Sequence, residues 1–261
     1  MKIAKIIEKL SCEYPASMAL PWDNPGLQVG NPEHSVKKIY VALDATDKVI
    51  EECIFWGADL LVTHHPLLMS GIKSVCSGDL HGGKILAMAE NRIAHYAIHT
   101  NYDVTAMARL AQDAMKLKKT KILEVTGRLD DGTEYGIGFC GEAKKKMTAE
   151  ECCSFVKKAF GLPNVRLFGS KEAEVKRVAL SPGSGKSMIA PALQAGADIL
   201  ITGDIGHHDG LDSVDQGLLI IDAGHYGIEH IFIDQMAAYL QESFPDVKVR
   251  KAEIVQPFEV I

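Results

Sequence analysis

The chain has 261 residues, of which 47% are hydrophobic and 24% charged, and its formal net charge is -6. These values exclude a mainly disordered protein, because a chain of this length and apolar content can bury a large apolar core. The core can belong to one elaborated domain or to two. The acidic balance provides no general basic surface, so we do not expect nucleic acid as a partner.

The first ten residues combine apolar and charged side chains at helical spacing, which predicts an amphipathic helix. A secretory signal would need a longer apolar core, and no run has the roughly 20 apolar residues that cross a membrane. The six cysteines have no Cys-x-x-Cys spacing, which favours reduced thiols. We therefore expect a cytoplasmic protein without a membrane partner.

Short apolar runs alternate with helical patterns along most of the chain. The predicted strands are residues 38–43, 59–63, 94–99, 177–181, 198–202 and 218–222. The predicted helices are residues 47–56, 82–91, 105–115, 187–195 and 228–243. This alternation predicts an α/β fold with parallel strands, either doubly wound or in three layers.

An internal repeat relates two halves of the chain. The first half has a strand, a helix and then the segment from Gly57 to His65. The second half has the same order and continues into the segment from Gly196 to Asp204. Each glycine is suited to end its helix, and each apolar run that follows is typical of a buried strand. We expect the two halves to bring four strand ends to one crevice.

Three parts are predicted from this pattern. They are a first α/β half over residues 1–125, a small α+β insertion over 126–175, and a second α/β half over 176–261 that packs on the first. The insertion contains an amphipathic segment from Thr148 to Phe160. Its lysine cluster, Lys144 to Lys146, is interpreted as a solvated turn.

Five residues predict a split metal site. His64 and His65 end an apolar run, at the carboxyl end of a strand, where open α/β sheets bind their ligands. His225 and Glu229 are four residues apart on a helix and share a face, a spacing that can hold one ion. Asp103 follows another strand and adds a carboxylate.

This set of imidazoles and carboxylates suits zinc, iron, manganese or cobalt better than calcium or magnesium. Two ions roughly 3.5–4 Å apart can share a water and ionise it near neutral pH, so hydrolysis or hydrolytic ring opening is the expected reaction. His99, Asp204 and His208 are weaker candidates, which would orient ligands or position substrate.

The competing interpretation is that these are ordinary surface or hydrogen-bonded core histidines, which are common. We interpret five histidines in this way: His34, His81, His95, His207 and His230.

The segment from Pro182 to Ser187 follows a strand and opens a helix, like the end of a phosphate-binding loop. The leading glycine of that motif would fall at Leu180, so a P-loop is not expected. A tight turn that needs glycine is the preferred interpretation, and anion binding by the backbone of Gly183 to Ser187 is the alternative.

Five motifs in order make the chain similar to the Nif-three-like family, also labelled GTP cyclohydrolase I type 2 homologs. The motifs are Trp22-Asp23-Asn24-Pro25-Gly26-Leu27-Gln28-Val29-Gly30, Thr63-His64-His65-Pro66-Leu67, His99-Thr100-Asn101-Tyr102-Asp103, Thr202-Gly203-Asp204 with His208, and Asp222-Ala223-Gly224-His225 with Glu229. Their combination is specific, whereas each motif alone is weak. The match covers almost the whole chain and corresponds to the shorter form of the family, without a larger central insertion.

The resemblance implies a three-layer Nif-three-like fold with two divalent metal ions per subunit. It places the metal ligands at the five residues that the spacing selected, His64, His65, Asp103, His225 and Glu229. It also implies a toroidal homohexamer, built as a trimer of dimers.

The expected function is hydrolysis of a nucleotide-like or other small anionic metabolite, with GTP as one candidate, through metal-bound hydroxide. His99 or His208 would assist proton transfer. The alternative is a non-catalytic metal-binding or regulatory scaffold that forms a ring. A third interpretation, a nucleic-acid clamp, would require a locally basic channel through that ring.

Overall fold

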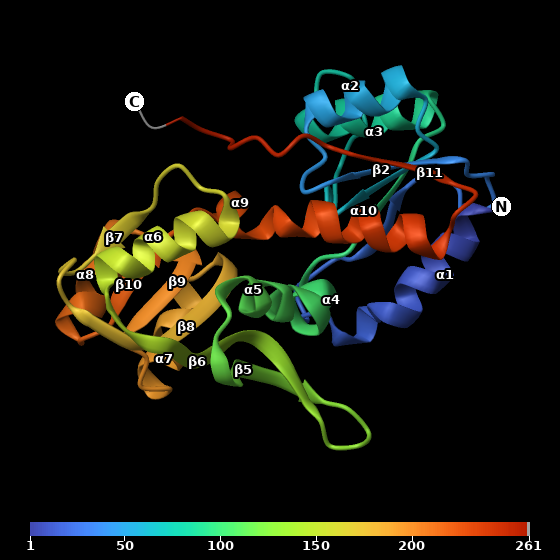
Figure 1. Ribbon diagram of the computed structural model, residues 1–261. Helices are drawn as coiled ribbons and strands as arrows, with labels where there is room; N and C mark the ends of the chain where they lie inside the picture. Colours follow the sequence, from blue (N-terminus) through green and yellow to red (C-terminus); the bar gives the residue numbers. More distant parts are fainter. Residues whose placement is uncertain (260–261) are drawn as a thin grey trace. The chain divides into compact units, whose positions relative to one another are not determined.

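The computed structural model describes residues 1–259 and contains two β-sheets, each flanked by helices (Figure 1). The chain divides into two compact units, the first formed by Met1–Tyr102 and Phe232–Val255, the second by Asp103–Ile231 and the residues from Gln256 onward. Across the described part of the chain, no helix combines the length and apolar character needed to cross a membrane.

The first unit contains a five-stranded sheet in the order β1-β4-β3-β2-β11. Its elements are α1 (Ile3–Glu13), the 3-10 turn η1 (Ala16–Met18), β1 (Gly26–Val29), β2 (Lys38–Ala42), α2 (Asp47–Trp56), β3 (Leu60–Thr63), α3 (Leu80–Glu90), β4 (Ala94–Ala97), α4 (Thr100–Tyr102), α10 (Ile231–Ser243) and β11 (Lys248–Lys251). Strands β11, β2, β3 and β4 are parallel to one another. Strand β1 pairs antiparallel to β4.

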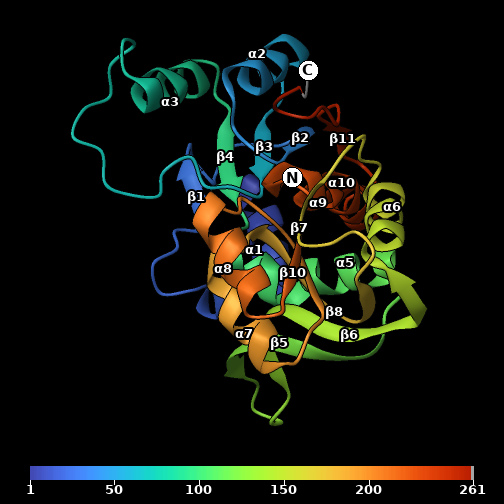
Figure 2. The same ribbon diagram turned by 90° about the vertical axis from the view of Figure 1, so that its left-hand side faces the viewer.

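Helices cover both faces of this sheet, so its central strands are apolar on both sides. Every residue of β3 is buried, as expected for a parallel strand between two helical layers. Tyr40 and Leu61 pack in one apolar cluster with Ile50 of α2 and Met88 of α3. Figures 1 and 2 show α2 and α3 on one side of the strands and α1 and α10 on the other.

The second unit contains a six-stranded sheet in the order β5-β6-β8-β9-β10-β7. Its elements are the π-helical turn η2 (Asp103–Met107), α5 (Ala108–Met115), β5 (Lys118–Arg128), β6 (Glu134–Thr148), α6 (Ala149–Phe160), β7 (Arg166–Phe168), β8 (Glu174–Ser184), the 3-10 turn η3 (Lys186–Met188), α7 (Ile189–Gln194), β9 (Ile199–Gly203), α8 (His207–Asp215), β10 (Leu219–Asp222) and α9 (His225–Glu229). Strands β8, β9 and β10 are parallel.

This sheet also lies between two apolar layers. On one side Ile199 and Ile201 pack in a cluster with residues of α5 and α6, among them Met115 and Val156. On the other side Leu200 packs in a separate cluster with residues of α7. The predicted α/β fold in three layers is therefore confirmed, and each of the six predicted strands overlaps a strand of the structure.

The two halves of the repeat share backbone contacts as well as element order. Asp59 precedes β3 and accepts hydrogen bonds from the amides of Lys37 and Lys38, at 2.8 and 2.9 Å. Asp198 precedes β9 and accepts from the amides of Lys176 and Arg177, both at 2.7 Å. In each half, a carboxylate at the start of one parallel strand therefore holds the start of its neighbour in register.

The unit boundaries differ from the division expected at residues 125 and 175. Strands β5 and β6 form a long hairpin that pairs with β8, and β7 pairs with β10, so residues 126–175 join the sheet of the second unit. The interpretation of Lys144 to Lys146 as a turn is wrong, because these residues lie within β6. Their side chains are exposed there, which explains the polar signal in the sequence.

Candidate metal centre

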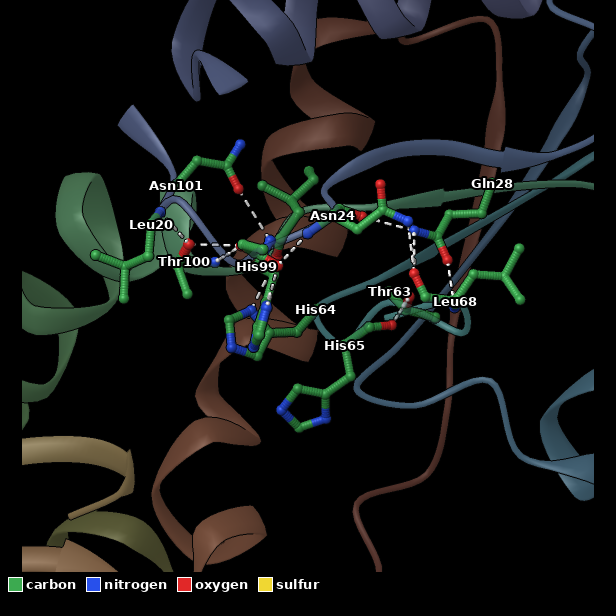
Figure 3. A network of polar contacts seen from close by, with 12 residues as sticks. Leu20, Asn24, Gln28, Thr63, His64, His65, Leu68, His99, Thr100 and Asn101 are labelled. Carbon is green, nitrogen blue, oxygen red and sulfur yellow. Dashed lines mark hydrogen bonds and ion pairs between the residues drawn. The ribbon is translucent and has the colours of Figure 1, made fainter. Parts of the chain in front are cut away.

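Three histidines lie together at the carboxyl ends of β3 and β4 in the first unit. His64 and His65 directly follow β3, and His99 comes two residues after β4. The ring centroids are 4.9 Å apart for His64 and His65, 5.2 Å for His64 and His99, and 5.6 Å for His65 and His99. One ring nitrogen from each lies within 4.8 Å of the others (Figure 3). This spacing lets the three imidazoles converge on a cation.

Each of these imidazoles uses its Nδ1 atom for a hydrogen bond to an oxygen acceptor. The Nδ1 of His64 donates to the carbonyl oxygen of Ile98 at 2.9 Å. In His65 and His99 the same atom donates at 2.7 Å to the carboxylates of Asp44 and Asp23. Because these acceptors need the proton on Nδ1, the neutral ring presents its lone pair at Nε2, the arrangement found in carboxylate-histidine-metal triads.

The carboxylate behind His99 is firmly held in its ionised state. The side chain of Asp23 is buried, and although burial alone would raise its pKa, hydrogen bonds from His99 and Thr100 lower it to about 2. The hydroxyl of Thr100 also accepts a hydrogen bond from the amide of Leu20, at 2.8 Å (Figure 3). The position of His99 is therefore determined by the loop before β1.

A buried polar chain supports the turn that carries His64 and His65. The Thr63 hydroxyl donates to the carbonyl oxygen of His65 at 2.7 Å. It also lies 2.8 Å from Nε2 of His95, and because its one proton is already used, His95 must be the donor. Burial lowers the pKa of His95 to about 4, which keeps the ring neutral.

The second unit contributes a histidine and three carboxylates, two of which contact that histidine. His225 and Glu229 form the first and last residues of α9, and their Nε2 and Oε2 atoms are 3.0 Å apart. The Nδ1 of His225 also lies 2.7 Å from the carboxylate of Asp204. A neutral imidazole has one N–H, which Nδ1 directs to Asp204, so Nε2 is the ring atom with a lone pair that faces Glu229.

Two backbone features shape this group. Asp204 has a φ of +56°, a left-handed conformation that is strained for most residues and that an Asp tolerates better than most. Gly183 has a φ of +76°, and a Cβ atom at this position would lie 2.5 Å from Oε1 of Glu229. The glycine that was predicted for a tight turn therefore also makes room for the Glu229 carboxylate.

Asp103 begins the turn η2 of the second unit, and one of its carboxylate oxygens lies within 4.8 Å of one from Glu229. The structure thus brings together His64, His65 and His99 in the first unit, and Asp103, His225, Glu229 and Asp204 in the second. His208 is exposed on α8, where its ring packs against His207 with centroids 5.1 Å apart.

Sequence reasoning missed the roles of Asp44 and Asp23 as partners of histidines. Asp44 follows β2, the neighbour of β3, so its place at a strand end is a signal that could have found it. Asp23 lies in a loop, and its only signal is the motif that begins at Trp22. Cys53 and Cys152 offer no competing nucleophile, because burial raises the pKa of each thiol to about 12.

Comparisons with known proteins show which sequences and structures this chain is similar to. The sequence model of the family described as "Duf34/NIF3 (NGG1p interacting factor 3)" matches residues 1–257. The chain is 33% identical to the GTP cyclohydrolase 1 type 2 homolog of Clostridium perfringens over 100% of both chains. It is 35% identical to the protein of the same name from Lactococcus lactis over 99% of both.

Solved structures show the same fold. A Bacillus cereus protein related to NIF3 superposes with a TM-score of 0.91 at 22% identity, covering 100% of this chain and 99% of that one. Reduced HcgD from Methanocaldococcus jannaschii superposes with a TM-score of 0.83 at 30% identity, covering 96% and 97% of the two chains.

Proposed function

Because the chain belongs to the Duf34/NIF3 family, we propose that it is a dinuclear metal-dependent hydrolase of a nucleotide-like or other small anionic metabolite. The proposed metal ligands are His64, His65, Asp103, His225 and Glu229. The relatives' name, GTP cyclohydrolase 1 type 2 homolog, makes GTP the first substrate to test.

One observation carries the metal assignment. His64, His65 and His225 each engage an oxygen acceptor through Nδ1, so in each the neutral ring has its lone pair on Nε2, the atom that can coordinate. Metal-binding histidines almost always use their second ring nitrogen in this way, which holds the coordinating nitrogen in place. The donor set of imidazoles and carboxylates fits zinc, iron, manganese or cobalt.

Divalent ions bound here would supply Lewis acidity and lower the pKa of a coordinated water. The protein's own contribution is to hold the imidazoles in one tautomer through their Nδ1 hydrogen bonds. His99, fixed by the ionised Asp23, is placed to carry a proton, and His208 is a second candidate for that role. The carboxylate of the proposed ligand Glu229 is buried and lies against Gly183, which restricts its position.

The assignment is tested by metal analysis of the purified, reconstituted protein and of a Glu229→Ala variant. We expect two ions per chain in the wild type and fewer in the variant, with the same circular dichroism spectrum. His81→Ala is a matched control, because His81 is exposed on α3 and outside the site. Unchanged metal content in Glu229→Ala would remove Glu229 from the site.

GTP turnover by the same preparations tests the reaction. Turnover that disappears with Glu229→Ala and persists with His81→Ala supports a nucleotide hydrolase. Metal-loaded protein without turnover would exclude GTP and favour a different substrate or the metal-binding scaffold.

A further inference from the structure

The second unit contains a pocket of about 700 Å³ at the carboxyl ends of β9 and β10. Its wall is formed by residues 162–165 after α6, by Arg166 of β7, by residues that follow the two strands, and by residues of the C-terminal segment. The volume is that of a typical small-molecule site, and the strand ends are where open α/β sheets bind ligands.

The pocket adjoins the second unit's candidate metal ligands. Two of its lining residues, Asp204 and Gly224, flank His225: Asp204 is hydrogen-bonded to its Nδ1, and Gly224 precedes it in the chain. A molecule in the pocket would therefore lie beside the residue that we propose as a metal ligand. The inference rests on the proposed function only through the assignment of His225 as a metal ligand.

Arg166 is held in place on the pocket wall. Its guanidinium donates to the carboxylate of Asp222 and, at 3.3 Å, to the carbonyl oxygen of Ile205. The Asp222 side chain is 3% exposed and also accepts hydrogen bonds from the amides of Ile205 and Gly224, at 3.0 and 2.9 Å. A buried carboxylate thus fixes one part of a guanidinium whose side chain remains 65% exposed.

Such a guanidinium is prepared to bind an anion. Arginine has five N–H donors in a rigid plane, so donors remain for a phosphate or carboxylate after the contacts with Asp222 and Ile205 are made. Because Asp222 already restrains the side chain, binding would cost little additional rotamer entropy.

The remaining wall is suited to a ring with polar edges. Leu162, Val165 and Phe258 provide apolar surface, and Asn164 and Gln256 provide amides. Asp204 and Glu259, also on the wall, would repel a simple anion. The Glu259 carboxylate would accept hydrogen bonds from the amino or ring N–H groups of a heterocycle.

We propose that this pocket binds an anionic, amino-substituted heteroaromatic metabolite the size of a nucleoside monophosphate. Arg166 pairs with its phosphate or carboxylate, the ring packs on Phe258 and Val165, and Glu259 accepts from the ring N–H groups. The reactive part of the molecule then faces His225.

Calorimetry on the full-length, chelator-treated protein tests the pocket without metal coordination. The probes are guanosine 5′-monophosphate, guanosine, inorganic phosphate and nicotinate. We expect the nucleotide to bind more tightly than guanosine or phosphate alone. Nicotinate, a ring carboxylate without an amino group, distinguishes a requirement for phosphate and ring N–H groups from a general affinity for aromatic anions.

Two variants distinguish the contribution of the ligand's anionic group to binding from the contribution of its ring. Arg166→Lys keeps a positive charge beside the buried Asp222 but loses the planar set of guanidinium N–H donors. It should weaken nucleotide binding about tenfold and leave guanosine binding unchanged. Phe258→Ala, at a 58% exposed side chain, should weaken nucleotide and guanosine alike. Leu211→Ala, an exposed apolar residue on α8 outside the pocket, is the control and should bind like the wild type.

Nucleotide binding that neither Arg166→Lys nor Phe258→Ala weakens would overturn the pocket assignment, as would the absence of nucleotide binding. Inorganic phosphate or nicotinate binding as tightly as the nucleotide would overturn the proposed ligand class. These results are distinguishable from failure of the proposed function, which is measured as metal content of Glu229→Ala.

Discussion

At the scale of single residues, the candidate site depends on which atom of each imidazole is already used. His65 and His225 are both exposed enough to reach a ligand, and each has a carboxylate on Nδ1. Asp44 would therefore act through His65, by fixing the tautomer and direction of its imidazole. Its effect should appear in affinity and leave the fold intact.

We predict that Asp44→Asn lowers metal affinity by roughly 10–100-fold, since an amide at this position can no longer act as a charged acceptor for the His65 N–H. Competition with a fluorescent chelator measures the change. Asp246→Asn, at an exposed acid near the C-terminus, is the matched control. Equal affinity in the two variants would contradict a role for Asp44.

A second residue-scale prediction concerns pH. Burial lowers the pKa of His95 from 6.5 to about 4. As the pH falls from 6.5 to about 4, His95 binds a proton in the unfolded chain but stays neutral in the folded protein. The free energy of unfolding therefore decreases. The loss is on the order of 3 kcal/mol in total and is complete below about pH 4.

Urea unfolding of metal-free protein at pH 7 and pH 5 measures this loss. His95→Gln, which can still donate to Thr63, should show a smaller decrease than the wild type. His34→Gln replaces an exposed histidine and should behave like the wild type. A decrease of the same size in His95→Gln would assign the pH dependence to other groups.

At the scale of elements, the ends of parallel strands position many of the candidate ligands and their partners. β2 is followed by Asp44, β3 by His64 and His65, and β9 by Asp204. The β8 strand contributes a glycine in place of a side chain, because its end passes next to Glu229 of α9. The candidate site therefore depends on the backbone next to it as well as on the candidate ligands.

We predict that Gly183→Ala reduces metal content, because its Cβ would lie 2.5 Å from Oε1 of Glu229 and displace the carboxylate. Gly196→Ala is a control for backbone strain alone, since Gly196 has a φ of +66° and no heavy atom lies within 4 Å of the Cβ that an alanine would add there. Both variants should lose about 1 kcal/mol of stability. Metal analysis should distinguish them, and equal metal content would contradict a role for Gly183 in making room for the Glu229 carboxylate.

At the scale of the whole molecule, we propose the homohexamer that the family resemblance implies, and exposed apolar side chains are candidates for its interfaces. Phe55 at the end of α2 is 92% exposed and Leu80 at the start of α3 is 68% exposed. Large apolar side chains gathered on neighbouring surface helices commonly mark an interface. Such an interface would remove them from water.

We therefore predict that light scattering of the purified protein gives a mass six times that of the 28.4 kDa chain. Because a toroidal trimer of dimers has closed symmetry, the mass should not increase with concentration once the ring is formed. A monomeric mass at micromolar concentration would contradict the hexamer. It would leave the metal assignment, which depends on residues of one chain, intact.

The periodic features of this protein could be read from its amino-acid sequence alone. Apolar runs located the central strands, the repeat was visible as Gly57-Ala58-Asp59 and Gly196-Ala197-Asp198, and helical spacing paired His225 with Glu229. These features are local, because strand and helix periods and i,i+4 neighbours follow from backbone geometry alone.

Partners that lie far apart in the chain became known only from the tertiary structure. The carboxylate behind His99 comes from Asp23, 76 positions away, and the long β5–β6 hairpin pairs with β8 in the sheet of the second unit. No local pattern encodes these contacts, since they depend on which strand ends and loops the packed sheets bring together. The same reason explains why the pocket beside Arg166, formed by four separate segments, had no signal in the sequence.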